Sequence, residues 1–443
     1  MEPINFYLGD ESRLVIEDFK SKNESLFKDS YDKALDVIYD IIQESKKNES
    51  NSDKDSASVF FRQTADSVKN NVVAFLGDRG TGKTSCMLSV ANMLRKINEG
   101  ENGKKIKDSC EKGFEILETI DPSFFDDKAN VLEVVLGRLF SNFRKKVDEG
   151  YTQGFKVNEC KKNELFKTFQ EVKECLTHMN AEKCVCEEDT AEGLLKLTAS
   201  VDMRNSIENL VENYLEFVGR DCLVISIDDI DMHTEHAYEM AEEIRKYLKQ
   251  PNVIVLMALK LEQLEQTIEL HYRKQYDKMI DKNAMSESTI VDMALKYVIK
   301  LIPENNRIYL PSVNVFADRE VNVYRKSENG KGKEYKGYHW YLVNKNREDD
   351  KNKDKKENTN ESENHSYQTL KYYVTSLIFR KTRYLFYHFQ GKISPIVPSN
   401  LRELRFLIEM LNNMGDYTKE NKCEYNKEKF KEYFLTTWAE NNL

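Results

Sequence analysis

The feature that most constrains this chain is a glycine-rich turn between two apolar segments. Val72–Leu76 is a short apolar run of the length that a buried parallel strand needs. Gly77–Thr84 follows at once and fits the pattern G-x-x-x-x-G-K-[ST] at every fixed position. Lys83–Lys96 then carries apolar residues at helical spacing. Strand, glycine turn and helix in this order predict a phosphate-binding loop, or P-loop, on a parallel α/β sheet flanked by helices.

The chemistry of phosphate binding explains the residue types in this loop. Backbone N–H groups wrap a polyphosphate only where side chains are absent, which accounts for Gly77, Gly80 and Gly82. Lys83 is predicted to reach the β- and γ-phosphates, and the Thr84 hydroxyl to bind Mg²⁺. The other loop residues expected at the nucleotide are Asp78, Arg79, Thr81 and Ser85.

A second motif lies far along the chain. Leu223–Ile227 is a mostly apolar strand that ends in Asp228 and Asp229, the Walker B pattern. We expect Asp228 to hold the hydrated Mg²⁺ ion and Asp229 to orient and polarise the attacking water. The alternative, a surface turn after a buried strand, is less consistent with the P-loop upstream.

Two groups of side chains contain the residue types of transition-metal sites. The first group is Asp231, His233 and His236. We interpret it as the start of a helix that Thr234 caps, rather than as a metal site. The second group is Cys160, Cys175, Cys184 and Cys186, with His178 between them. Its irregular spacing lacks the paired C-x₂-C of zinc sites and favours reduced thiols.

Further strands complete the sheet. Phe114–Ile120 is predicted as the second strand, and Val253–Leu259 as a buried strand that ends at Lys260, a candidate to touch the γ-phosphate. Alternation around Ile308 predicts a fifth strand, and Arg307 just before it is expected to face a neighbouring subunit.

The chain divides into four predicted parts. These are a helical lead-in over 1–70, a nucleotide-binding core over 71–315 with a helical insertion at about 144–215, a flexible polar insertion over 316–366, and a helical lid over 367–443. In the lid, Ser399 is predicted to cap a helix on which Arg402 and Arg405 share one face.

Composition limits the function classes. The chain has 443 residues, of which 32% are charged, and a net charge of −9. This balance gives no broad basic surface, so nucleic-acid binding would need a local patch and has no support. Neither a signal peptide nor a membrane span is expected, which predicts a cytoplasmic protein without a membrane partner.

The order of these motifs resembles that of the AAA+ ATPases, especially their STAND-type relatives. Ile227–Asp231 and the helix up to Leu248 are similar to bacterial STAND and KAP-type defence ATPases, including the ATPase components of deaminase-linked phage-defence systems of the RADAR kind. The resemblance covers roughly residues 70–415. It implies ATP and Mg²⁺ as ligands, a homo-oligomer, and a partner effector that is a deaminase in the RADAR case.

The resemblance also implies roles for single residues. Lys260 would be sensor 1, Arg402 sensor 2 and Arg307 the arginine finger. Asp229 stands where most AAA+ proteins have glutamate, which leaves turnover open. The guanine-reading motif of GTPases is not matched by Asn344–Arg347, so ATP is expected.

Three functions are compatible with the sequence. The first is an ATP-hydrolysing oligomeric switch, with a role in antiviral defence. The second is a scaffold that nucleotide locks without turnover. The third is a DNA-binding initiator ATPase, which needs a DNA-binding module for which Glu420–Leu443 is short.

Overall fold

The structure is a computed structural model, and part of the chain is described in it. The described residues are 4–8, 16–52, 70–100, 103–122, 130–153, 158–180, 190–232, 236–325, 336–337, 369–385, 397–415 and 424–439.

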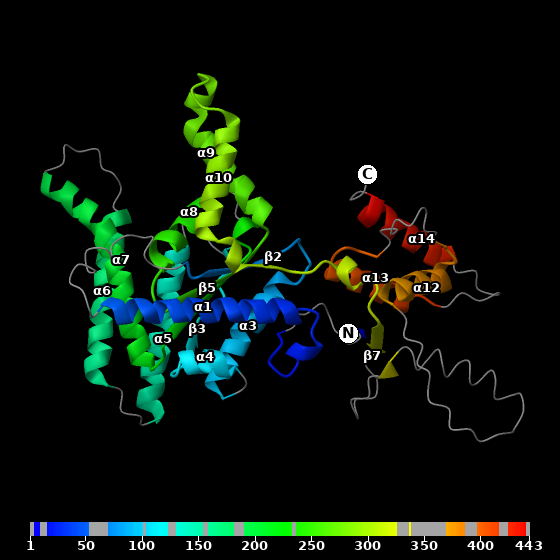
Figure 1. The fold of residues 1–443 in the computed structure, drawn as a ribbon, viewed down its shortest axis with the longest axis horizontal. Coiled ribbons are helices and arrows are strands. Elements are labelled where there is room, and N and C mark those ends of the chain that lie inside the picture. The colour runs from blue at the N-terminus through cyan, green and yellow to red at the C-terminus, as the bar shows by residue number, and fades with distance from the viewer. Residues whose placement is uncertain are drawn as a thin grey trace, which may run out of the picture.

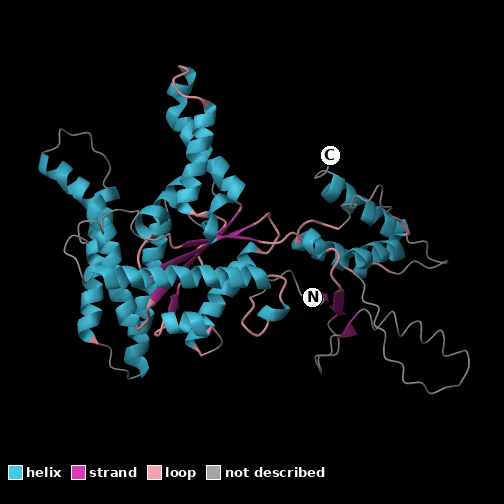
Figure 2. Ribbon diagram, viewed as in Figure 1, coloured by secondary structure: helices cyan, strands magenta, loops and turns pink. Residues whose placement is uncertain are grey.

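The centre of the molecule is a parallel five-stranded sheet (Figures 1 and 2). In spatial order its strands are β3 (Phe114–Ile116), β4 (Cys222–Asp228), β5 (Val253–Leu259), β2 (Val72–Leu76) and β6 (Arg307–Tyr309). The predicted parallel α/β fold is confirmed. The sequence did not reveal the strand order, in which β5 separates the P-loop strand β2 from the Walker B strand β4.

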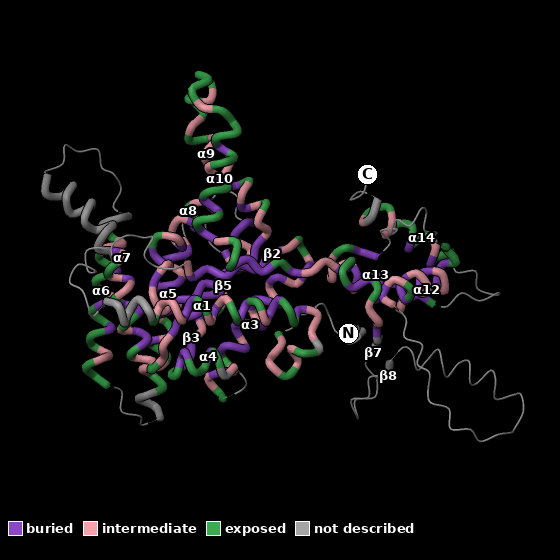
Figure 3. The backbone as a smooth tube through the Cα atoms, in the orientation of Figure 1, coloured by how far each residue is buried: buried purple, intermediate pink, exposed green. Residues whose placement is uncertain are grey.

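Each central strand sends alternate side chains to opposite faces, and both faces are buried (Figure 3). On β2, Val72, Ala74 and Leu76 belong to one apolar cluster, whereas Val73 and Phe75 belong to the other. This two-sided burial explains why the strands are continuous apolar runs.

Helices cover the two faces. The face of Val73 and Phe75 packs against α1 (Lys28–Ser52), α3 (Lys83–Asn98) and α4 (Lys104–Ser109). The opposite face packs against a larger set: α5 (Val131–Gln153), α6 (Glu159–Asn180), α7 (Thr190–Val218), α8 (Ala237–Glu243), α9 (Leu261–Asp281) and α10 (Glu287–Leu301). Figure 1 shows α9 and α10 side by side as a hairpin that projects from the core.

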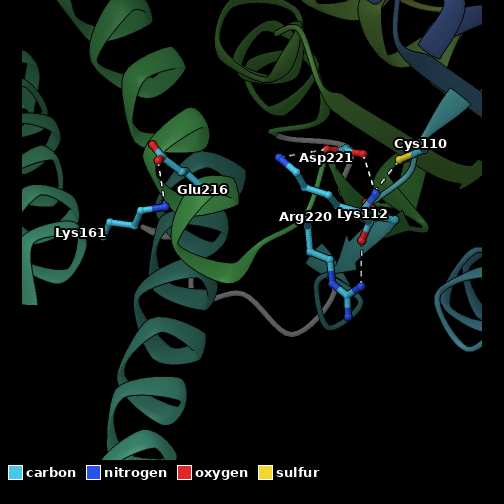
Figure 4. A network of polar contacts seen from close by, with 7 residues as sticks. Cys110, Lys112, Lys161, Glu216, Arg220 and Asp221 are labelled. Carbon is cyan, nitrogen blue, oxygen red and sulfur yellow. Dashed lines mark hydrogen bonds and ion pairs between the residues drawn. The ribbon is translucent and has the colours of Figure 1, made fainter. Parts of the chain in front are cut away.

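The amino ends of β3 and β4 are held together by polar contacts (Figure 4). The Lys112 amide donates to Asp221 Oδ2 at 2.8 Å, and Arg220 donates to the Lys112 carbonyl at 2.9 Å. Nearby, Lys161 of α6 pairs with Glu216 of α7 at 2.9 Å. The contacts between β3 and β4 lie at the amino ends of the strands, whereas the P-loop follows the carboxyl end of β2. We therefore assign them a structural role.

The C-terminal helices form a unit with its own apolar cluster. The unit contains α12 (Leu370–Thr382), α13 (Leu401–Asn413), α14 (Glu424–Tyr433) and the π-helical turn Phe434–Ala439, and it lies at one end of the molecule in Figure 1. The predicted cap of α13 was wrong by one residue. Asn400, rather than Ser399, is the N-cap, because Asn400 Oδ1 accepts the Glu403 amide at 2.9 Å.

A small second sheet contains β1 (Ile4–Leu8), β7 (Val321–Arg325) and β8 (Lys336–Gly337). The short helical turns are Lys22–Glu24, Ile230–Met232, Ile244–Leu248, Glu304–Asn306 and Val313–Phe316. Most of the polar insertion lies outside the described residues. None of the described helices is long and apolar enough to cross a membrane.

Candidate nucleotide site

The P-loop connects β2 to α3, and its glycines are required by the backbone. Gly80 and Gly82 have φ angles of 85° and 97°, which L-residues rarely adopt. A Cβ atom on Gly77 would lie 2.7 Å from Thr81 Oγ1. The loop closes on itself, because the Thr81 hydroxyl donates to the Asp78 carbonyl at 2.8 Å. The first N–H groups of the 16-residue helix α3 have no partners within the helix, so the loop ends at an anion-binding helix terminus.

The two motifs meet across the sheet. The Thr84 hydroxyl donates to Asp228 Oδ1 at 3.1 Å, although the two residues are 144 positions apart. Burial raises the pKa of Asp228 to about 6, and the hydrogen bond from Thr84 opposes the shift. A buried carboxylate next to a hydroxyl is a pair of hard oxygen ligands, which is the donor set that Mg²⁺ prefers.

The chain turns sharply after Asp228. Asp229 has a φ of 47°, in the left-handed region, and its amide donates to the Ala258 carbonyl of β5 at 2.9 Å. Asp231, at 2% exposure, accepts the Lys260 amide on Oδ2 at 3.1 Å. The sequence analysis placed Asp231 at the start of a helix rather than in a metal site, and in the structure its carboxylate joins the ends of β4 and β5.

Lys260 follows β5 as predicted, and its side chain reaches the P-loop. Its ammonium lies 2.8 Å from Asp78 Oδ1 and 3.7 Å from Glu262 Oε2. Lys83, only 8% exposed, directs its ammonium to the Asp78 carbonyl at 3.4 Å. The structure thus brings both lysines to the same loop residue.

The lid contacts the P-loop through the start of α13. The Arg402 amide donates to the Gly80 carbonyl at 3.2 Å, and a Cβ on Gly80 would lie 2.9 Å from Asn400 Oδ1. The two lid arginines differ: Arg405 pairs with Glu409 at 2.9 Å, whereas the Arg402 side chain is exposed beside the loop. This placement favours Arg402 over Arg405 as the lid residue near phosphates.

One contact was not predicted from the sequence. A Cβ on Gly82 would lie 2.7 Å from Phe27 Cζ, so the ring of Phe27 covers the end of the P-loop. No sequence motif marks Phe27, which is one apolar residue before the stripe of α1.

The structure places the Arg307 side chain in the interior of its own subunit. Its side chain is 7% exposed within its own chain, and Nε donates to the Ile302 carbonyl at 3.0 Å. It is the first residue of the edge strand β6, where its backbone pairs with Ala74 of β2.

Within the described part of the chain, no group of three or more His, Cys, Asp or Glu side chains is arranged to hold a metal ion. Cys160 is exposed and Cys175 half-buried, both as free thiols. Cys184, Cys186, His233 and Thr234 lie outside the described residues. The described N-cap of α8 is His236, which makes no capping hydrogen bond through its side chain.

A glycine loop at a helix N-terminus, with a buried lysine and a Thr–Asp oxygen pair, defines a P-loop nucleotide-binding protein. Comparison with known families agrees, since residues 31–287 match the KAP family P-loop domain. This match covers more than half of the 443 residues, and the chain belongs to that family. No curated protein matches the chain.

Proposed function

We propose that this protein binds and hydrolyses ATP with Mg²⁺ and acts as an AAA+/STAND-type oligomeric switch. The observation that carries the proposal is the contact between Thr84 and Asp228, which joins the phosphate loop to the Walker B strand. Membership of a P-loop NTPase family supports nucleotide hydrolysis in general. The choice of ATP rests on the unmatched guanine motif at Asn344–Arg347 and on the resemblance to AAA+ proteins.

The residues have distinct roles in this proposal. Lys83 and the loop amides bind the phosphates, and Thr84 and Asp228 hold Mg²⁺, which supplies charge neutralisation at the transferred phosphoryl group. Asp229, next to Asp228, orients the water. Lys260 and Arg402 approach the terminal phosphate from β5 and from the lid.

The oligomer is proposed because such sites use an arginine from a neighbour, worth about 10³–10⁵ in rate in well-studied systems. Arg307 is buried in its own subunit, so we propose that another arginine is the finger. We propose a cytoplasmic role in bacterial antiviral defence with a partner effector, a deaminase in a RADAR-like system. The support for this setting is the resemblance of Ile227–Asp231 to defence ATPases.

The second candidate is a scaffold that ATP locks with negligible turnover. Asp229 favours this candidate, because its side chain is shorter than that of glutamate and places the carboxylate farther from the attacking water. Its backbone is also held in the left-handed region. Ligand at about 100 times its dissociation constant stabilises the bound state by about 2.7 kcal/mol, which is enough for such a lock.

The test is ATP hydrolysis per subunit against protein concentration, with Lys83→Ala as the blank. A rate per subunit that rises with concentration supports a hydrolytic site shared between subunits. Asp229→Asn should then abolish turnover and preserve assembly, measured by light scattering. A rate at the level of the blank at every concentration, together with ATP-dependent assembly, would favour the scaffold.

A further inference from the structure

The backbone of Lys260 is fixed, whereas its side chain has a choice of partners. The Lys260 amide is held by the buried carboxylate of Asp231 at 3.1 Å, at the point where β5 ends and α9 begins. The side chain extends from this anchor toward the P-loop and is 38% exposed. A new partner for the ammonium therefore requires only side-chain rotation.

The partner in this structure is a P-loop carboxylate. The ammonium lies 2.8 Å from Asp78 Oδ1, and this contact raises the pKa of Lys260, which is a cation at neutral pH. The Asp78 side chain is 74% exposed. Exposed ion pairs are weak and exchange partners readily, so a stronger anion can displace Asp78.

Asp78 also lies where phosphates are expected. Its carbonyl accepts the Lys83 ammonium at 3.4 Å, so Asp78 presents a backbone oxygen to one lysine and a carboxylate to the other. A polyphosphate along the loop would offer anionic oxygens to the same two ammonium groups. A bound phosphate and Asp78 would therefore compete for the ammonium groups of Lys83 and Lys260.

We propose that Asp78 competes with the terminal phosphate of a nucleoside triphosphate for Lys260, and that this competition sets the preference of the site for triphosphate over diphosphate. The inference rests on the proposed function, because it concerns the same site. A diphosphate bound at Lys83 leaves the Lys260–Asp78 pair intact. A triphosphate has to break it.

The experiment compares the affinities of the full chain for a β,γ-imido ATP analogue and for ADP, both with Mg²⁺, by calorimetry. In Asp78→Asn and Asp78→Ala, the affinity for the ATP analogue relative to that for ADP should rise about two- to fivefold over the wild type. Both variants keep the backbone carbonyl that receives Thr81 and Lys83. The exposed position of Asp78 makes a folding defect unexpected.

Two controls distinguish the direct contact between Asp78 and Lys260 from the general effect of removing a negative charge near the site. Glu262→Gln removes the same unit of negative charge at the more distant partner, 3.7 Å from Lys260, and should change the ratio of the two affinities less. In a Lys260→Ala background, Asp78→Asn should lose its selective effect on the triphosphate.

The outcomes are distinguishable. Equal tightening of both nucleotides, or an unchanged ratio in both Asp78 variants, overturns the competition and leaves the proposed function standing. A wild type that binds neither nucleotide overturns both. Selective tightening that disappears in the Lys260→Ala background supports the proposal.

Discussion

At the scale of single residues, burial of the Asp228 carboxylate at the nucleotide site should lower the free energy of unfolding. Asp228 is 8% exposed, and burial raises its pKa to about 6, so ionisation of this group is disfavoured in the folded protein. The unfolded chain ionises it at its ordinary, lower pKa. Between the two pKa values the folded state binds more protons, and stability falls as the pH rises.

Asp228→Asn should therefore unfold at a higher temperature than the wild type at pH 8. Two pKa units correspond to at most about 3 kcal/mol of unfolding free energy. The gain should be small at pH 4, grow up to pH 6 and stay constant above it, because the Asn oxygen still accepts the Thr84 hydroxyl. Thermal unfolding in EDTA without nucleotide measures this. A variant less stable than the wild type at pH 8 would contradict the account.

Asn71 makes a separate contribution to the structure beneath the site. It is 2% exposed, and its side-chain amide donates to the carbonyls of Leu248 and Val253, each at 2.8 Å. These bonds tie the start of β2 to the turn before β5.

Asn71→Ala should lower the free energy of unfolding by about 1–3 kcal/mol, because two buried hydrogen bonds are lost, although the Leu248 carbonyl still accepts the Gln250 amide at 3.0 Å. Denaturant unfolding measures the change. The control is Asn92→Ala, which removes a part-buried bond to the Glu17 carbonyl and an exposed bond from Arg95, and should cost about 1 kcal/mol or less. Equal losses in the two variants would show that the buried position of the Asn71 bonds adds nothing to their strength.

Several of these residues also mark the limit of sequence reasoning. The roles proposed for Lys83, Thr84 and Asp228 follow from local motifs with a known chemical purpose. The contacts of Asp231 and Phe27 depend on partners brought close only by the folded sheet. Arg307 was expected to be exposed because it precedes a short strand, whereas in the structure its side chain is buried and donates to the Ile302 carbonyl.

At the scale of elements, the strands and their apolar faces were predictable because periodicity is a local property. The order of the strands and the position of the lid on the P-loop were not predictable, since both depend on packing between distant segments. The lid meets the P-loop at Gly80, whose carbonyl receives the Arg402 amide. This contact gives the lid a direct connection to the phosphate site.

Gly80→Ala should loosen this connection. The new methyl group would meet Asn400 Oδ1 at 2.9 Å and Arg402 Cβ at 3.0 Å, in addition to strain at a φ of 85°. Hydrogen exchange of the Arg402 amide should become faster. Gly100→Ala is the matched control, since its φ of 89° imposes the same strain and its nearest neighbour, Lys107 Nζ, is 3.9 Å away. If the Arg402 amide exchanged faster in both variants, backbone strain alone would explain the effect.

At the scale of the whole molecule, the chain has separate apolar cores. Two lie on the faces of the sheet, and a third is formed by the C-terminal helices together with Val313, Phe316 and Val321. Leu401 packs against both the lid core and the α3 side of the sheet, which makes it a joint between them. A molecule with such a narrow apolar connection should unfold in more than one step.

Hydrogen exchange in denaturant allows this to be measured, because the amides of α12 and α13 lie in the C-terminal unit. Exchange of these amides should report the C-terminal unit, while far-UV circular dichroism reports all helices, and the two unfolding curves should not coincide. Leu377→Ala, a 2% exposed lid residue, should lower the unfolding free energy obtained from the exchange of these amides by about 2–5 kcal/mol. Leu223→Ala, fully buried in β4, should instead shift the main dichroism transition. If both curves coincide and both variants move them equally, the lid and the nucleotide core unfold as one cooperative unit. The coupling between them would then be far stronger than the single hydrogen bond between the Arg402 amide and the Gly80 carbonyl can explain.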